Sequence, residues 1–410
     1  MRSWLALLLI ALAGFWAGRH AWAWHHRHAA AQALAHHRPH EARDHLDACL
    51  KVWPNDPEAL LLASGAARRL GDFAAAEEHL RTLERAAPAA KDALDLEWSL
   101  VRASAGAIDD KIEDFLLPLA AREPALAPAI WEALIEGYVR VYRIREAFLC
   151  ADRWLAVDPD NVQALYLRAT IHRHIRRLAK AVPDLQKVIE LDPTRDDARK
   201  WLALGLIEAG HYEVAANHLR ELRRRMPGDA SIVIHLARAL KDLGQTQEAR
   251  DLLDGLLADQ PEHAHALRVR GEVELAADPA EAERWLRKAV AVAPFEYQAH
   301  FLLSQALSRQ SKDAEAKKQR IVADDLKDRS ERLGDIMARR MSIYPHDPAL
   351  HVEMGTLLIS LGEKDLGRDW LQSALQKDPA FRPAHAALAE YYQDAGDAKQ
   401  AAAHRRQARP

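Results

Sequence analysis

The sequence has only two cysteines, Cys49 and Cys150, among 410 residues, and neither belongs to a CxxC motif. The sequence therefore predicts no disulfide framework, no thiolate metal site and no dithiol redox centre. Glycine is also scarce, at 17 residues. Runs of β-branched residues are few, whereas Ala, Leu, Arg and Glu are abundant, which favours a chain that is almost entirely helical.

An excess of charge of one sign is also missing. The chain carries 57 basic and 60 acidic residues, a formal net charge of -3, which argues against nucleic-acid binding by bulk positive charge. No glycine-rich phosphate loop, GxSxG or HExxH motif is present. We therefore expect no catalytic activity, no cofactor and no nucleic-acid partner. An enzyme whose site is carried on the helices is an alternative, for which the sequence offers no candidate residues.

A long hydrophobic run is lacking, but a short one occupies residues 4–18. A membrane-spanning helix needs roughly 20 apolar residues, and this length is reached only if Arg19 snorkels and the segment continues to Trp24. We expect residues 1–24 to form an uncleaved signal anchor, which makes the chain a single-pass membrane protein of a bacterial cell envelope. A cleaved signal peptide is the alternative, because Ala21-Trp22-Ala23 fits the small-x-small rule.

The side of the membrane stays open at this stage. Arg19, Arg27 and Arg38 follow the apolar run and outweigh Arg2 before it, which by the positive-inside rule would hold the rest of the chain in the cytoplasm. The short leader with a single arginine instead resembles an export signal, and an extracytoplasmic location is slightly favoured.

Prolines recur at a fixed interval. Pro159, Pro193, Pro227 and Pro261 are each 34 residues apart, and each follows a segment with helical spacing of apolar residues. Proline ends a helix, because it lacks the N–H group and clashes with the preceding turn. A 34-residue period with two helical patterns per period is typical of a helical solenoid.

Within each period, similar residue types recur at similar offsets. The fourth repeat has Trp131, Leu134, Tyr138, Ala147, Trp154 and Pro159, and the seventh has Leu236, Ala237, Leu240, Gly244, Ala249, Leu253 and Pro261. This pattern resembles the tetratricopeptide repeat (TPR). The resemblance covers residues 23–410 and implies an all-α fold, a right-handed superhelical solenoid of about ten antiparallel helix pairs. In that fold Ala76, Ala181, Ala215 and Ala249 would sit at the helix crossing, and Leu80, Leu185, Leu219 and Leu253 would face the next repeat.

The repeats also predict how the chain is divided. We expect TPR repeats 1–9 (first part) over residues 25–311, the last repeat with capping helices over 346–410, and inserted or extended helices over 312–345. The segment 312–345 contains 17 residues beyond the period. Either the second helix of the ninth repeat is lengthened there or, as Gly334 favours, an additional helix is inserted. The tenth repeat has Gly367 where the family usually has Ala.

Histidines are concentrated between residues 20 and 45. His25 and His28 are spaced i,i+3 and His36 and His40 are spaced i,i+4, so each pair would share a helical face and could bind a metal or sense protons. The alternative is an ordinary polar helical face. No third thiolate or carboxylate ligand is placed in the pattern, and we predict no metal site.

The resemblance also implies where a partner would bind. The inner surface of a TPR superhelix is lined by the first helix of each pair, where this sequence places Tyr166, Arg173, Lys200, Arg238, Lys241 and Arg268. A basic inner surface favours an acidic or C-terminal peptide, because arginine pairs bidentately with carboxylates. The alternative is that these are ordinary solvated helix residues.

We therefore expect a non-catalytic, membrane-anchored scaffold or adaptor that binds a protein or peptide partner, possibly acidic. An accessory assembly subunit of an envelope biogenesis enzyme system is the alternative. A fold of this kind does not by itself define a function.

Overall fold

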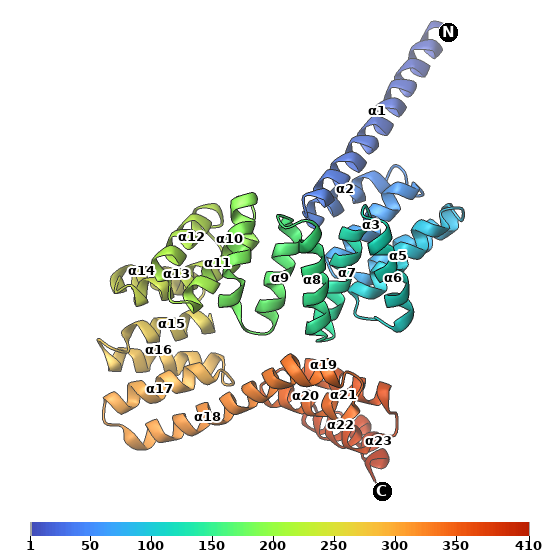
Figure 1. Ribbon diagram of the computed structural model, residues 1–410. Helices are drawn as coiled ribbons and strands as arrows, with labels where there is room; N and C mark the ends of the chain where they lie inside the picture. Colours follow the sequence, from blue (N-terminus) through green and yellow to red (C-terminus); the bar gives the residue numbers. More distant parts are fainter. Residues whose placement is uncertain (1, 410) are drawn as a thin grey trace. The chain divides into compact units, whose positions relative to one another are not determined.

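The computed structural model describes the backbone of residues 2–409 and the side chains of residues 14, 16–337, 339–341 and 343–409. Over this part of the chain every regular element is a helix and no strand occurs (Figure 1). The helices are α1 (Arg2–Ala35), α2 (Pro39–Leu50), α3 (Pro57–Arg69), α4 (Phe73–Ala86), α5 (Lys91–Ser104), α6 (Asp110–Arg122), α7 (Ala127–Arg140), α8 (Ile144–Val157), α9 (Val162–His174), η1 (Leu178–Ala181), α10 (Val182–Leu191), α11 (Asp196–Glu208), α12 (Tyr212–Arg225), α13 (Ala230–Asp242), α14 (Thr246–Asp259), α15 (Ala264–Glu274), α16 (Pro279–Val292), α17 (Tyr297–Arg309), α18 (Asp313–Asp335), η2 (Ile336–Arg340), α19 (Met341–Ile343), α20 (Pro348–Ser360), α21 (Lys364–Lys377), α22 (Arg382–Asp394) and α23 (Ala398–Ala408). The predicted all-α class is confirmed.

The pair α13–α14 shows how the sequence specifies one repeat. Asp229 caps the start of α13, because its carboxylate accepts hydrogen bonds from the backbone N–H groups of Ser231 and Ile232. After α13 ends, Gly244 adopts a φ of 77°, and the chain turns back into α14. A left-handed backbone costs little at glycine because it has no Cβ. The expected antiparallel helix pair is therefore built by a cap at one end and a glycine at the other.

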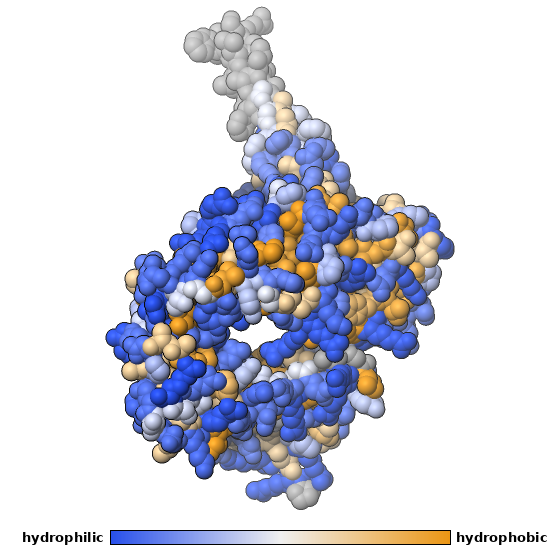
Figure 2. All heavy atoms as spheres, turned by 60° about the vertical axis from the view of Figure 1, so that its left-hand side comes forward, coloured by the Kyte–Doolittle hydropathy of each residue, from blue (hydrophilic) through white to orange (hydrophobic). Residues whose placement is uncertain are grey.

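The packing residues predicted from the repeat are buried. Ala76, Ala181, Ala215 and Ala249 have exposed fractions of 0%, and Leu80, Leu185, Leu219 and Leu253 are at most 1% exposed. The two helices of successive pairs contact each other, as in α11 with α12, α13 with α14 and α20 with α21. Over the face shown in Figure 2, hydrophilic side chains cover most of the surface and hydrophobic ones form separate groups. The chain is thus an all-helical solenoid whose core lies between neighbouring helices.

The chain divides into two compact units, Met1–Leu167 and Arg168–Pro410, and the boundary falls inside α9. The first unit has apolar clusters built around α1–α3 and around α3–α5. The second unit has a large cluster spanning α11–α17 and a smaller one at α15–α18.

The predicted single-pass membrane localisation is contradicted by the structure. No helix among the described residues is long and apolar enough to cross a membrane. The span would have needed residues 19–24, but two of them contact the first repeat: Trp53 Nε1 donates to His20 Nδ1 at 2.7 Å, and Arg19 Nη2 donates to the carbonyl oxygen of Lys51 at 3.5 Å. The predicted boundary after residue 24 also falls within a continuous helix, α1.

The 17 additional residues before Pro345 lengthen a helix. α18 runs without a break from Asp313 to Asp335 and continues through one π-helical turn, η2, into α19. The long α18 is visible in Figure 1 as the helix that joins α17 to the C-terminal helices. The structure thus has the lengthened second helix, and the additional helix that Gly334 favoured is wrong, because α18 continues through Gly334 without a break. π-helices are rare and occur mostly as single turns within α-helices, as here.

Three histidines repeat one structural role in the second unit. They are His300, His351 and His385, and each lies six residues after a repeat proline. Each histidine donates a hydrogen bond from Nε2 to the carbonyl oxygen of that proline. Its Nδ1 contacts a side chain of the following helix. Arg199 occupies the equivalent position and donates to the carbonyl oxygen of Pro193 at 2.9 Å. These polar side chains therefore join the end of one helix pair to the next.

Candidate functional site

Five of the six predicted partner-binding residues lie in the second unit, and Tyr166 lies in the first. The five are carried by α9, α11, α13 and α15, and the last three helices contact one another as neighbours. The structure thus brings Lys200, Arg238, Lys241 and Arg268 to one row of first helices, as the repeat predicts. Tyr166 lies on α9, at the end of the first unit.

Two of these cations are paired with carboxylates of the same unit. Lys200 Nζ lies 2.9 Å from Asp229 Oδ2, and Lys241 forms an ion pair with Glu272. The pKa of Lys241 is raised because hydrogen bonding and charge at Glu272 and Asp242 outweigh its burial. Neither side chain offers an uncompensated charge to a partner.

Arg268 and Arg173 are also occupied. Arg268 is 6% exposed and its Nε lies 2.6 Å from Glu296 Oε1. The Arg173 guanidinium stacks on Trp201, with its Cζ 4.3 Å from the ring centroid. Both side chains contribute to the packing of the repeats, and a substitution of either would disturb the fold as well as any binding.

Arg238 differs from the other predicted residues. It is partly exposed on α13, and among the described residues it has neither an ion pair nor a hydrogen bond. The positive charge of Arg238 nevertheless lowers the pKa values of His235 and His265. We call Arg238, His235 and His265 the Arg238 site.

The two histidines of the Arg238 site lie side by side on α13 and α15. Their ring centroids are 5.7 Å apart, and His235 Nδ1 and His265 Nε2 are buried without a hydrogen-bond partner among the described atoms. Burial, reinforced by the nearby arginines, lowers the pKa of His235 to about 4 and that of His265 to about 3. At neutral pH both imidazoles are uncharged and can donate or accept a hydrogen bond.

The sequence analysis missed these histidines, although a signal was present. His235 and Arg238 are spaced i,i+3, and His265 and Arg268 repeat that spacing in the next period. The i,i+3 spacing places each pair on the same helical face. The pattern His-x-x-Arg in consecutive repeats could therefore have identified this part of the surface.

The first unit contains a buried charged network that the sequence analysis also missed. Glu132 on α7 is 2% exposed, and it accepts hydrogen bonds from Arg69 Nε at 2.8 Å and from Gln163 Nε2 at 2.9 Å. His37, at the α1–α2 turn, lies 3.7 Å from the same carboxylate. Burial alone would raise the pKa of Glu132, but His37 and the arginines hold it below its usual value.

The histidine-rich segment contributes to folding contacts. His26 Nδ1 lies 2.8 Å from His45 Nδ1, and His36 Nδ1 lies 2.8 Å from the carbonyl oxygen of Gln32. In the described part of the chain, no group of three or more His, Cys, Asp or Glu side chains is placed to hold a metal ion. Cys49 and Cys150 are free and buried.

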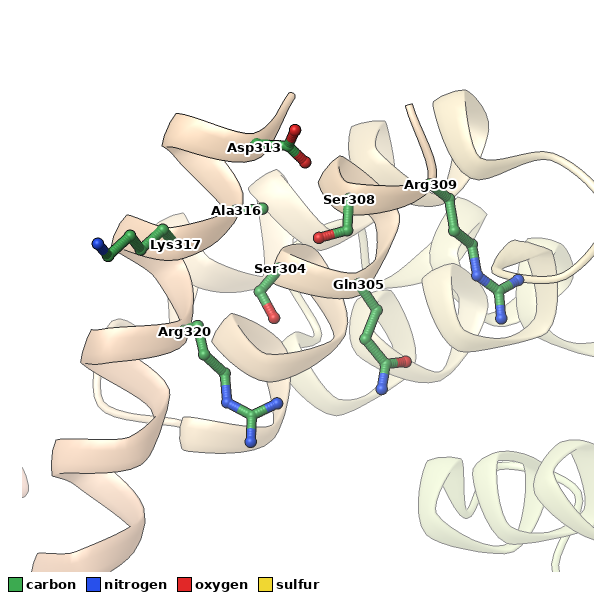
Figure 3. Close-up of a pocket in the computed structure, with 8 residues that line it drawn as sticks. All are labelled: Ser304, Gln305, Ser308, Arg309, Asp313, Ala316, Lys317 and Arg320. Atoms are coloured by element: carbon green, nitrogen blue, oxygen red, sulfur yellow. The ribbon is translucent and has the colours of Figure 1, made fainter. Parts of the chain in front are cut away.

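A polar hollow lies between α17 and α18 (Figure 3). It has a volume of about 470 Å³ and is lined by Ser304, Gln305, Ser308, Arg309, Asp313, Ala316, Lys317 and Arg320. Its two arginines are already engaged, because Arg309 donates to the carbonyl oxygen of Leu275 and Arg320 lies over the ring of Phe301. The hollow is a weaker candidate than the Arg238 site.

Comparison with protein families gives three matches. Residues 29–91 and residues 206–272 each match a model of the tetratricopeptide repeat, and residues 141–222 match a model described as anaphase-promoting complex, cyclosome, subunit 3. The match over 206–272 includes the whole of α13 and of the His235–Arg238 segment.

Individual relatives match only short segments. The chain is 37% identical over 68 residues to sperm-associated antigen 1 of Mus musculus, which is 17% of this chain and 8% of that protein. It is 33% identical over 123 residues to cellulose synthase operon protein C of Xanthomonas axonopodis pv. citri (strain 306), which is 27% of this chain and 8% of that protein. The chain thus spans less than a tenth of the length of these curated relatives.

Among solved structures, a tetratricopeptide repeat protein from Parabacteroides merdae ATCC 43184 is similar over 70% of this chain and 98% of its own, with 16% identity and a TM-score of 0.46. The regular helix pairs, the caps and turns between them, and the family matches over 29–91 and 206–272 support the assignment of this chain as a tetratricopeptide repeat protein.

Proposed function

We propose that this chain is a non-catalytic scaffold that binds an acidic peptide segment of a partner protein at the Arg238 site. Tetratricopeptide repeat proteins generally mediate interactions between proteins. The observation that carries the proposal is the uncompensated charge of Arg238, next to two buried imidazole nitrogens that have no partner among the described atoms.

The chemistry of the Arg238 site fits a carboxylate. The Arg238 guanidinium can donate two parallel hydrogen bonds to it, and neutral His235 and His265 can each donate one more. The positive charges of Lys200 and Arg268 also lower the pKa of His235. A metal cation would be repelled by these groups, whereas a carboxylate would be attracted to them.

The test is a binding titration with a fluorescently labelled hexa-glutamate peptide that has a free C-terminus, followed by fluorescence polarisation. Losing a hydrogen bond to a charged group costs about 1.5–3 kcal/mol, so Arg238→Gln should weaken binding by about 10- to 100-fold. Arg224→Gln is the matched control, because Arg224 is exposed on α12 and has no ion pair among the described residues.

Equal affinity of wild-type protein, Arg238→Gln and Arg224→Gln would overturn the proposal, as would the absence of binding at millimolar peptide. Circular dichroism of each variant would establish that the helices are intact. Since Arg238 makes no ion pair in the described structure, its substitution should not lower stability.

A further inference from the structure

The inner row of first helices in the first unit contains a carboxylate that lacks a cation of its own. Glu136 follows Glu132 by one helical turn on α7 and is partly exposed. No described residue forms an ion pair with it. Around it the other charges are matched: Arg69 pairs with Glu132 at 2.8 Å, and Arg68 pairs with Glu97 at 3.2 Å.

The charge balance of this group therefore depends on Glu136. Arg68 and Arg69 offset Glu97 and Glu132, and His37 is charged only when it is protonated. An ionised Glu136 adds one negative charge that nothing in the network compensates. Elsewhere in the chain, buried carboxylates are held by arginine, as Asp184 is by Arg168 at 2.7 Å.

A second, independent observation indicates an unfilled position. Gln163 is 7% exposed and donates through Nε2 to Glu132, yet its Oε1 is buried and has no partner among the described atoms. An orphaned buried carbonyl oxygen is costly, so it calls for a donor from outside the protein. Gln163 is hydrogen-bonded to Glu132 and Glu136 lies one helical turn beyond it, so both offer acceptor oxygens beside the same carboxylate that a donor-rich cation would satisfy.

We propose that Glu136 and the carboxamide oxygen of Gln163 form a site for the guanidinium group of an arginine side chain on a partner protein. Guanidinium is favoured over ammonium because its planar fork can reach two acceptors at once. We call these two residues the Glu136 site. At the network's surface the His37 and Arg69 side chains are 27% and 18% exposed, whereas the Glu132 side chain that both contact is 3% exposed.

The protonation of Glu136 makes the proposal measurable. Burial and the negative charge of Glu132 raise the pKa of Glu136 to about 7, whereas Arg68, Ser104 and Arg69 lower it. His37, the remaining titratable group of the network, faces Glu132. A guanidinium binds only the ionised carboxylate, so the apparent affinity should follow the ionised fraction. That fraction rises about tenfold between pH 6 and pH 8 for a pKa near 7.

The experiment is a titration of the full chain with a labelled hexa-arginine peptide at pH 6 and pH 8 and constant ionic strength. Arginine stays charged at both pH values, and with the label attached to its α-amino group the peptide itself does not titrate. Wild-type protein should bind about tenfold more tightly at pH 8. Glu136→Gln should lose most of the affinity at pH 8 and most of the pH dependence. Glu84→Gln, an exposed carboxylate on α4, is the matched control and should behave as wild type.

The competing possibility is that Glu136 only serves the fold by turning towards Arg68, whose Nη1 is buried without a partner. In that case Glu136→Gln would change the melting temperature and leave hexa-arginine binding and its pH dependence as in wild type, which would overturn the proposal. Should Glu136→Gln fail to fold, Gln163→Leu tests the same site, because it removes the second acceptor; unchanged binding there would equally refute it. A hexa-lysine peptide that binds as tightly as hexa-arginine would refute the preference for guanidinium.

Discussion

The close approach of α5 and α7 at Gly137, in the first unit, allows a sharp test of the packing. Gly137 lies on α7, and a Cβ atom at this position would be 1.8 Å from the carbonyl oxygen of Ala103 and 2.9 Å from Ile108 Cδ1. A carbon and a carbonyl oxygen approach each other to about 3.3–3.6 Å. Gly137→Ala would therefore force α5 and α7 apart by on the order of 1.5 Å.

The expected magnitude combines two opposing contributions. Alanine is better than glycine in a helix by about 1 kcal/mol. Overpacking a close contact costs about 1–3 kcal/mol and occasionally more, and here the obstacle is backbone, which cannot rotate away as a side chain can. We expect Gly137→Ala to lower the free energy of unfolding by about 2 kcal/mol or more. For a unit of this size the melting temperature should fall by roughly 4–8 °C.

Gly255→Ala is the matched control. Gly255 is exposed within α14, and no atom lies within 4 Å of a Cβ built on it. Only the helix-propensity gain applies there, so this variant should be more stable by up to about 1 kcal/mol. Thermal unfolding, monitored by circular dichroism, compares the melting temperatures of the variants. Amide hydrogen exchange should localise the effect of Gly137→Ala to α5–α7, because a loss of stability in a repeat stack stays near the mutated repeat. A Gly137→Ala protein as stable as wild type, with unchanged exchange in α5, would refute the described approach of these helices.

Two further predictions concern the second unit. Gly367→Ala restores the residue that the family usually has, yet it should destabilise the protein by about 1–2 kcal/mol, because its Cβ would lie 2.6 Å from the Gly355 carbonyl oxygen; a higher melting temperature would contradict this. Because the pKa of His235 is lowered to about 4, the unfolded chain binds more protons below pH 6.5, so acidification destabilises the native state. For one such histidine the free energy of unfolding should fall by about 2 kcal/mol between pH 7 and pH 5. Urea unfolding of wild type and His235→Leu at both pH values measures this, and an equal acid sensitivity of the two proteins would count against a buried, neutral His235.

The sequence was sufficient for the features that repeat. The 34-residue proline spacing predicts the helix pairs, and the small and large apolar positions, such as Ala249 and Leu253, are buried as expected. The row of first helices that carries Lys200, Arg238 and Arg268 could also be predicted, because side-chain direction follows from helical periodicity.

The properties that depend on neighbouring repeats could not be predicted. Whether a lysine or arginine forms an ion pair depends on carboxylates roughly 30 residues away in the chain, as Asp229 is from Lys200. The residue type at one repeat position does not reveal that pairing. The membrane span was inferred from an apolar run that is too short by itself, and two of the residues needed to extend it contact Trp53 and the carbonyl oxygen of Lys51 instead. Gly367 looked like a departure from the pattern, whereas it fits a close contact with Gly355.

Polar residues on the first helices therefore fall into two classes that the sequence alone does not separate. His351 is satisfied, because Nε2 donates to the Pro345 carbonyl oxygen at 3.0 Å and Nδ1 lies 3.1 Å from Ser373 Oγ. Arg238 and Glu136 lie on equivalent helices without an ion pair. Keeping an ionised side chain partly buried and unpaired costs stability. Since the helix pairs are already joined by residues such as His351, the fold itself gives no reason for that cost, and binding of an oppositely charged group does.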